Sequence, residues 1–378
     1  MPDGNYSCFD LSVSRELNRY YCISTEVLLV FADKPFAAFP DAAPARAAAP
    51  LCAVLVDAEE DFDWQAPVRG VAHTVDCMRQ LGAFQRIVTD AGAVPTYMLT
   101  YPVLQDIGIV QDLRRLLARG ACRVGIHLHP WVTPPFHEAP ELRYSFAGNL
   151  PAALEERKLL ALMRLFRIAF GHFPSIYRAG RYGLGPNTPG LLEKHGFDVD
   201  TSLAPCSSFA GDGGPDFSGN DYGTFWFGRS RRLLELPLCR GIAGWGGKPA
   251  RFTYRWLAAA EPPRGTALRQ YLPGLMARTR CAERITLSPE GGDASAAARL
   301  MSDLLRRQRN VVTLSLHSSS FRVGQNPYVR TQADLHAFYD RLAAMLDTLK
   351  NGCGMRFVAA TELPGMLERE VVCGMAAE

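Results

Sequence analysis

His127 and His129 lie two residues apart at the end of an apolar segment, residues 124–128, and Pro130 follows them. The segment is typical of a buried strand that ends at a rim. Positions i and i+2 share one face of a strand, so both imidazoles can point into one cavity. Neutral imidazoles bind zinc, iron, cobalt or nickel, but a catalytic site needs a third protein ligand and an open position. Ordinary rim or core histidines are the alternative interpretation.

A cluster of acidic residues follows a second apolar segment, residues 51–56. Five carboxylates fall within residues 57–63. Such a cluster repels itself unless a cation or a shared proton relieves the repulsion. Asp57 and Glu59 have the same two-residue spacing as the histidine pair, so both can face one cavity. The two strand ends therefore offer metal ligands and one spare carboxylate as a base, while a solvated acidic turn is the alternative.

Two further segment ends carry polar residues that suit such a site. Arg178 follows residues 175–177 and precedes a glycine turn, and His317 ends the apolar segment 311–316. The carboxyl ends of parallel strands converge on one face when the strands close into a barrel. We therefore expect Arg178 and His317 to lie at the same rim as the acidic cluster and the histidines.

The elements that must position these residues alternate from Leu51 onward between short apolar segments and amphipathic ones, which is typical of an α/β fold with parallel strands. Apolar spacing predicts helices over 74–91, 106–119, 154–170, 187–195, 288–308 and 331–350, and mostly helix over 250–282. Strands are expected at 51–56, 94–100, 124–129, 175–179, 196–202, 233–238 and 311–317, with 357–360 as a further candidate. Long loops at 134–151 and 206–229 are expected over the rim.

The composition excludes several classes of protein. The net charge of +3 comes without a basic stripe, so neither nucleic acid nor an anionic membrane is an expected partner. The ten cysteines are scattered without a Cys-x-x-Cys pair, which favours reduced thiols over disulfides or a zinc knuckle. No signal peptide and no membrane span is apparent, so we expect a cytoplasmic protein. The oligomeric state is left open.

The first 50 residues differ from the rest of the chain. Residues 36–50 are rich in alanine and proline and have little to bury, which is typical of a linker. We therefore expect an N-terminal extension and linker over residues 1–50 and one α/β domain over residues 51–378.

Four motifs resemble those of the polysaccharide deacetylase family, also called carbohydrate esterase family four or the NodB-homology domain. The resemblance covers roughly residues 51–357. It implies a distorted (β/α) barrel of about seven parallel strands. The motifs are Val56-Asp57-Ala58-Glu59, His127-Leu128-His129-Pro130-Trp131, Tyr177-Arg178-Ala179-Gly180-Arg181-Tyr182-Gly183 and Leu314-Ser315-Leu316-His317.

The resemblance also implies catalytic roles. Asp57 would be the general base, Arg178 would orient it and keep it ionised, and His317 would protonate the leaving amine. The ligands of a divalent metal would be Glu59, His127 and His129. Zinc is the expected metal, with iron, cobalt or nickel as alternatives. The expected substrate contacts are Trp131, Tyr182 and Leu316.

This sequence departs from the family pattern at four places, and one of them is that Arg181-Tyr182 sits one residue off the family's Arg-Pro-Pro-Tyr pattern. The family spaces its ligand histidines four apart, but Trp131 stands four after His127, so strand geometry selects His129. The spacing of Asp57 and Glu59 replaces an adjacent Asp-Asp pair, which leaves Glu60 or Asp61 as alternative ligands. No acidic residue near 235–245 matches the family's acid that tunes the histidine.

The expected function is metal-dependent hydrolysis of an N-acyl group, N-acetyl in the first place, from an amino sugar or a sugar-containing intermediate. Two alternatives stay open. One is a deformylase or a cyclic amide or imide hydrolase on the same scaffold. The other is a catalytically inactive carbohydrate-binding relative. The expected partner is a small-molecule or glycan substrate.

Overall fold

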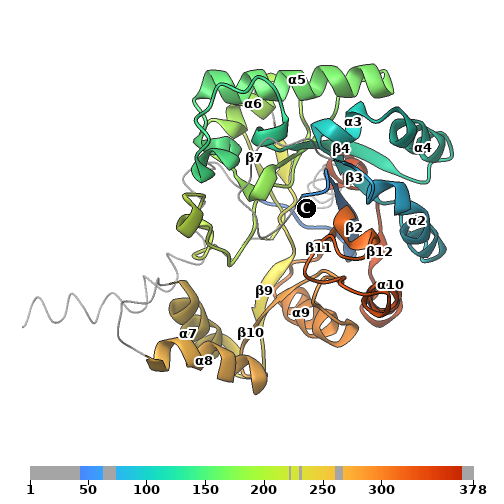
Figure 1. Cartoon of the computed structure of the whole chain (residues 1–378). Helices are drawn as coiled ribbons and strands as arrows, with labels where there is room; N and C mark the ends of the chain where they lie inside the picture. Colours follow the sequence, from blue (N-terminus) through green and yellow to red (C-terminus); the bar gives the residue numbers. More distant parts are fainter. Residues whose placement is uncertain (1–42, 63–73, 221–222, 230–231, 260–266, 368–378) are drawn as a thin grey trace, which may run out of the picture.

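Seven parallel strands form a curled sheet in the computed structural model, which describes residues 43–62, 74–220, 223–229, 232–259 and 267–367 (Figure 1). Every neighbouring pair along the order β11-β2-β3-β4-β5-β6-β8 is parallel. This confirms the predicted α/β fold with a distorted (β/α) barrel of about seven strands. The strands are β2 (Leu51–Ala58), β3 (Thr96–Leu99), β4 (Arg123–Leu128), β5 (Ile176–Ala179), β6 (Val199–Asp200), β8 (Leu233–Glu235) and β11 (Val311–His317).

Irregular backbone bridges the gap between the β6–β8 edge and β11. Leu238 donates its main-chain N–H to the carbonyl of Leu203 at 2.9 Å. Leu287 donates to the carbonyl of Cys239 at 2.8 Å, and Ser315 of β11 donates to that of Leu287 at 3.2 Å. The barrel is therefore distorted because loop segments, rather than paired strands, complete its wall.

Short strands extend the sheet at its margins. β7 (Phe225–Phe227) pairs antiparallel with β8, β1 (Ala43–Pro44) pairs antiparallel with β7, and β12 (Arg356–Phe357) pairs parallel with β2. β9 (Arg240–Ala243) and β10 (Glu283–Thr286) form a separate antiparallel pair, in a region expected to be loop and helix. Figure 1 shows α7 (Gly247–Ala259) and α8 (Ala267–Arg278) beside this pair, away from the other helices.

The remaining helices cover the outside of the curled sheet (Figure 1), and local signals set their ends. Asp106 caps α4 by accepting from the N–H of Ile109 at 3.0 Å. Asp293 caps α9, which begins six residues later than predicted because Ser288–Gly292 forms a turn. These helices are α2 (Leu81–Asp90), α3 (Tyr101–Gln105), α4 (Ile107–Ala118), α5 (Ala152–Phe170), α6 (Thr188–Lys194), α9 (Ala294–Arg306) and α10 (Gln332–Asp347).

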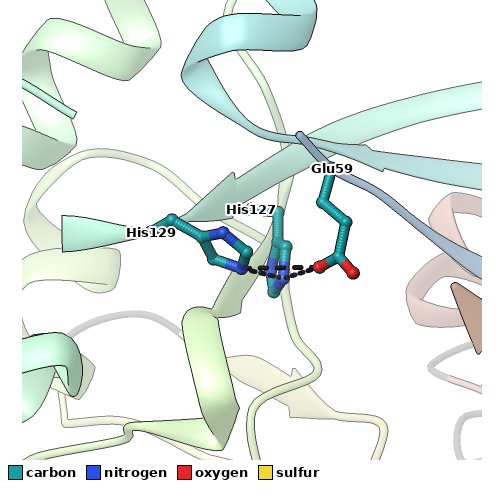
Figure 2. Close-up of side chains that lie close together, drawn as sticks. All are labelled: Glu59, His127 and His129. Carbon is teal, nitrogen blue, oxygen red and sulfur yellow. Dashed lines mark hydrogen bonds and ion pairs between the residues drawn. The ribbon is translucent and has the colours of Figure 1, made fainter. Parts of the chain in front are cut away.

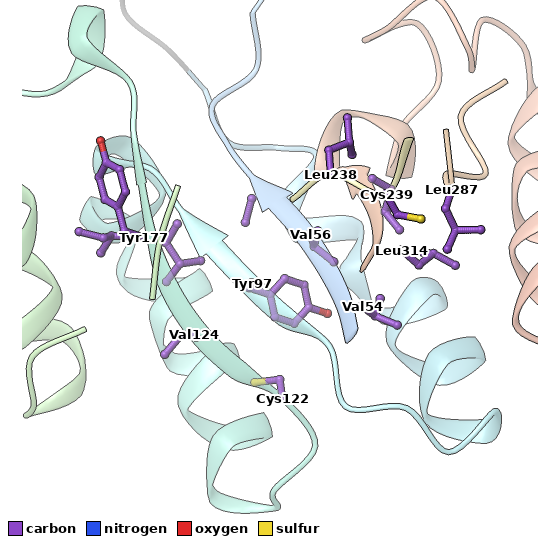
Figure 3. Packing of buried hydrophobic residues seen from close by; sticks show 14 of the residues in the cluster. Val54, Val56, Tyr97, Cys122, Val124, Tyr177, Leu238, Cys239, Leu287 and Leu314 are labelled. Carbon is purple, nitrogen blue, oxygen red and sulfur yellow. The ribbon is translucent and has the colours of Figure 1, made fainter. Parts of the chain in front are cut away.

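Strand alternation divides the core into two layers. In β2, Cys52, Val54 and Val56 belong to the cluster beneath the helices, part of which Figure 3 shows. Leu51, Ala53 and Leu55 belong to a second cluster, together with residues of β5, β6, β8 and β11. Asp57 follows the parity of this second group. The same alternation that buries the apolar side chains therefore aims Asp57 into the barrel.

Part of the expected linker belongs to the folded domain. Ala43 and Pro44 pair with β7, and Ala45 and Ala47 are buried. Ala47 also donates its N–H to the side chain of Asn310 at 3.2 Å. The rest of the expected extension, residues 1–42, lies outside the described residues. Among the described helices, none combines the length and apolar composition needed to cross a bilayer.

Candidate metal centre

Glu59, His127 and His129 bring three ligand atoms together at the end of β4 and just past β2 (Figure 2). The two Nε2 atoms of the histidines lie 2.9 Å apart. Oε2 of Glu59 lies 3.8 Å from Nε2 of His127 and 3.6 Å from Nε2 of His129. All three side chains are buried. The structure therefore brings together the three residues that the sequence suggested as metal ligands.

Hydrogen bonds at the Nδ1 atoms fix the orientation of the two imidazole rings. Nδ1 of His127 lies 3.3 Å from the carbonyl oxygen of Arg178, and Nδ1 of His129 lies 2.8 Å from Oε1 of Glu60. Both partners accept, so a proton on each Nδ1 leaves each Nε2 able to present a lone pair to a cation. Two lone pairs at this separation repel each other unless a positive charge lies between them.

The protonation preferences fit a cation at this position. Burial and the neighbouring His129 lower the pKa of His127 to about 3, so this imidazole stays neutral and able to ligate. Burial raises the pKa of Glu59 well above its usual value, and its buried Oε1 has no hydrogen-bond partner in the described structure. A divalent cation would neutralise the carboxylate and accept both imidazole lone pairs.

The two alternative carboxylate ligands have other partners. Glu60 is hydrogen-bonded to His129; burial alone would raise the pKa of Glu60, but that imidazole lowers it to about 2. Asp61 accepts from the main-chain N–H groups of Asp76 and Cys77 at 2.7 and 3.2 Å, and so anchors the chain before α2. Glu60 therefore orients a histidine, Asp61 holds a turn, and Glu59 is the carboxylate that faces both imidazoles.

Close packing holds the ring of His129. The indole of Trp131 stacks on it with 4.1 Å between ring centroids and 26° between planes. On another side, a Cβ atom at Gly180 would lie 2.5 Å from Cδ2 of His129 and 2.7 Å from the carbonyl oxygen of Leu128. Position 180 therefore has no room for a side chain, which explains the glycine that follows β5.

Asp57 and Arg178 form a buried ion pair beside the three ligand candidates. Nη1 of Arg178 donates to Oδ1 of Asp57 at 2.5 Å, and Nε of Arg178 donates to Oγ1 of Thr201 at 2.9 Å. Burial alone would raise the pKa of Asp57, but the charge of Arg178 outweighs it and the pKa is lowered. The pair keeps Asp57 ionised and fixes its orientation.

His317 approaches the same carboxylate from the end of β11. Its Nε2 lies 3.6 Å from Oδ2 of Asp57, and its Nδ1 lies 2.8 Å from Oε2 of Glu290. Burial lowers the pKa of His317, but Glu290 and the other nearby carboxylates outweigh burial and raise it to about 10. His317 is therefore a protonated imidazolium at neutral pH.

Glu290 is a site residue that the sequence did not predict, because the apolar spacing of residues 288–308 indicates a single helix. Glu290 instead lies in the turn after β10, where its Oε1 accepts from the N–H of His317 at 2.8 Å and from Oγ of Ser320 at 2.6 Å. The acidic partner of the histidine was sought near residues 235–245. The sequence carries no clear signal for this turn, because β10 ends at Thr286 and Ile285 is its one buried side chain.

A cavity of about 680 Å³ joins these groups. It is lined by the three ligand candidates, the three catalytic candidates and two of the expected substrate contacts, Trp131 and Tyr182. Arg181 and Tyr182 adopt left-handed backbone conformations with φ of 54° and 55°, which form the tight turn after Gly180. The expected contact from Leu316 is wrong: this side chain is 1% exposed in the hydrophobic core, because neighbours in β11 alternate faces and Ser315 and His317 line the cavity instead.

No protein-family model matches the sequence, and no curated protein matches it. Solved structures are similar to this chain at low identity and with low TM-scores. A putative polysaccharide deacetylase from Mycobacterium smegmatis is 17% identical with a TM-score of 0.45, over 86% of this chain and 96% of that one. A probable polysaccharide deacetylase from Pseudomonas aeruginosa PAO1 is 11% identical with a TM-score of 0.46, over 85% and 91%. The allantoinase PuuE is 12% identical with a TM-score of 0.45, over 89% and 97%.

Proposed function

We propose that this chain is a metal-dependent hydrolase that removes an N-acyl group, acetyl in the first place, from an amino sugar or a sugar-containing intermediate. One observation carries the proposal. Asp57 is held by Arg178 on one oxygen and faces His317 on the other, in the same cavity as the three ligand candidates. A base, an acid and a metal site around one opening are what amide hydrolysis needs.

Glu59, His127 and His129 would hold the metal. Their donor set of one carboxylate and two imidazoles fits zinc and also accepts iron, cobalt or nickel. A divalent cation there supplies Lewis-acid chemistry, since it lowers the pKa of water and polarises an amide carbonyl. Glu60 and the main chain at Arg178 hold the two imidazoles in the tautomer that ligation requires.

The other polar residues would carry the protons. Asp57 is ionised because Arg178 pairs with it, so it accepts the proton of the attacking water. His317 is protonated because Glu290 pairs with its Nδ1, so its Nε2 can donate a proton to the departing amine. An amine leaves poorly as an anion, so this proton is needed for the C–N bond to break. Main-chain N–H groups of the tight turn at Gly180 would stabilise the oxyanion.

The test is release of acetate and formate from a panel of N-acetylated and N-formylated sugars and cyclic amides. The wild type should release acetate from at least one N-acetylated sugar. Asp57→Asn should lose about a hundredfold or more of that activity, because a general base contributes roughly this much. Asp112→Asn, which removes a carboxylate from the exposed face of α4, is the matched control.

The panel also separates the alternatives. Formate release or ring opening alone would indicate a deformylase or a cyclic amide hydrolase. Binding of a sugar with no product formed from any compound would indicate an inactive carbohydrate-binding relative and would contradict the proposal.

A further inference from the structure

Arg240 begins β9 and is half-buried in the wall of the cavity. Its Nε donates to Oγ1 of Thr286 at 2.7 Å, and its Nη1 donates to Oγ of Ser207. Both partners are neutral hydroxyls. None of the carboxylates in the described part of the chain forms an ion pair with Arg240, although a guanidinium is always charged. These two hydroxyls fix the fork of Arg240 without neutralising it.

Every other charged side chain along the cavity has an opposite partner or a place in the metal centre. Asp57 pairs with Arg178, and Glu290 pairs with His317. Arg181 pairs with Asp212 near the opening. Glu59 faces the two ligand histidines. Arg240 is therefore the cation of the cavity that lacks a counter-charge within the described residues.

The surroundings of Arg240 add to this imbalance. Burial lowers the pKa of Arg240; the nearby Tyr182 opposes this, and the charge of Arg284 lowers the pKa further. Arg284 donates to the carbonyl oxygen of Cys206 at 3.3 Å. A half-buried cation beside another cation is unfavourable unless an anion compensates it. The hydroxyl groups of Thr286, Ser288 and Tyr328 also line the cavity and can hydrogen-bond to anionic oxygens.

We propose that Arg240 binds an anionic group, a carboxylate or a phosphate, on a substrate whose N-acyl group lies at Asp57. The guanidinium fork matches the oxygens of both groups and binds them by charge-assisted hydrogen bonds. The cavity volume of about 680 Å³ suits a sugar with one such substituent. This assignment of the substrate class rests on the proposed function, because that function places the reacting amide.

The test compares matched ligands by calorimetric titration of the full chain carrying Asp57→Glu, which displaces the base and slows turnover but keeps a carboxylate as the counter-charge of Arg178. The neutral ligand is N-acetylglucosamine, and the anionic ligands are N-acetylmuramic acid and N-acetylglucosamine 1-phosphate. At least one anionic ligand should bind about tenfold or more tightly than the neutral one, as a charge-assisted hydrogen bond predicts. The anionic ligand that binds more tightly than the neutral one shows whether the site prefers a carboxylate or a phosphate.

Variants at two arginines locate the effect. Adding Arg240→Gln should bring the dissociation constants of the anionic and neutral ligands to within about twofold of each other. Arg240→Lys should retain part of the preference for the anionic ligand. Arg181→Gln should keep the preference, because Asp212 already neutralises that arginine. The methyl ester of N-acetylmuramic acid removes the ligand's charge without any mutation and should bind like the neutral ligand, so the test does not depend on how well Arg240→Gln folds.

The outcomes separate this inference from the proposed function. Equal binding of charged and neutral ligands would overturn the inference, even if the wild type releases acetate. A preference that survives Arg240→Gln in a protein with unchanged thermal unfolding would overturn it as well. Selective binding of an anionic ligand that needs Arg240, without acetate release by the wild type, would support the anion site and contradict the hydrolase.

Discussion

Glu60 and His129 form a buried hydrogen-bonded pair, with Oε1 of the carboxylate 2.8 Å from Nδ1 of the imidazole. The pair leaves Nε2 of His129 facing Nε2 of His127 at 2.9 Å. Carboxylates in this position fix the tautomer and the ring orientation of a metal-ligating histidine. In the proposed mechanism, the acidic cluster at the end of β2 therefore supplies a base, a ligand and a residue that orients another ligand.

Replacing Glu60 by Gln should weaken metal binding about 10- to 100-fold, because the amide holds the His129 ring less firmly than the carboxylate does. Competition with a chelator of known affinity measures the change. Asp112→Asn, on the exposed face of α4, is the control and should leave the affinity unchanged. Equal zinc affinity in wild type and Glu60→Gln would show that the pair is not needed to position the ligand.

Gly180→Ala should also lower metal affinity, through a steric cause. The added Cβ would lie 2.5 Å from Cδ2 of His129, so the imidazole must move from its position beside His127. Gly190→Ala is the matched control, because no atom lies within 4 Å of a Cβ there. The same chelator competition applies to both. Tight zinc binding by Gly180→Ala, equal to that of Gly190→Ala, would contradict the packing described around His129.

Replacing His317 by Gln should reduce hydrolysis of an N-acetyl amide about 10²- to 10⁴-fold, since a general acid contributes this much. The loss should be far smaller with 4-nitrophenyl acetate, because 4-nitrophenolate leaves without being protonated. The ratio of kcat/KM for the two substrates is the measurement. An equal loss on the amide and on the aryl ester would show that His317 acts in some way other than by protonating the leaving group.

The four strand ends could be predicted from the sequence because each follows an apolar segment with a clear strand pattern. That pattern ends where a strand ends. β2 ends at Ala58, so alternation places Asp57 but cannot decide how Glu59, Glu60 and Asp61 divide their partners. The backbone beyond the strand makes that choice, through contacts with residues that are distant in the sequence.

Glu290 and Arg240 were missed for a related reason. Both belong to the segments around the β9–β10 pair. β9 is the four-residue strand Arg240–Ala243, and β10 buries one side chain, that of Ile285. Strands this short have no long apolar run to detect. The expected glycine-rich loop over 239–249 thus contains β9, and the expected helix over 288–308 includes a turn that carries Glu290. Glu290, the partner of the proposed proton donor His317, and Arg240, the proposed anion site, both lie in this less regular part of the fold.

A second buried carboxyl pair predicts how stability depends on pH. Burial raises the pKa of Asp200 to about 6, and burial together with Asp200 raises the pKa of Glu235 well above its usual value. The folded state therefore binds more protons than the unfolded state above about pH 4, so these groups make stability fall as the pH rises toward 6 and beyond.

Glu235→Gln should reduce this fall, because the amide cannot ionise and can still accept from the N–H of Leu203, which lies 3.0 Å from Oε1 of Glu235. Urea unfolding of wild type and variant at pH 4.5, 6 and 7.5 measures the difference. The free energy of unfolding of the variant minus that of the wild type should increase with pH. A gain that stays constant or shrinks over this range would contradict the raised pKa of Glu235.

The most direct test of the account is the metal content of the protein after dialysis against trace zinc, measured by mass spectrometry. The wild type should hold about one zinc per chain, and the double variant His127→Ala, His129→Ala should hold none while remaining folded. His336→Ala, at an exposed position of α10, should match the wild type. A wild type without metal, or a double variant that retains one zinc per chain, would contradict the metal centre from which the proposed hydrolysis follows.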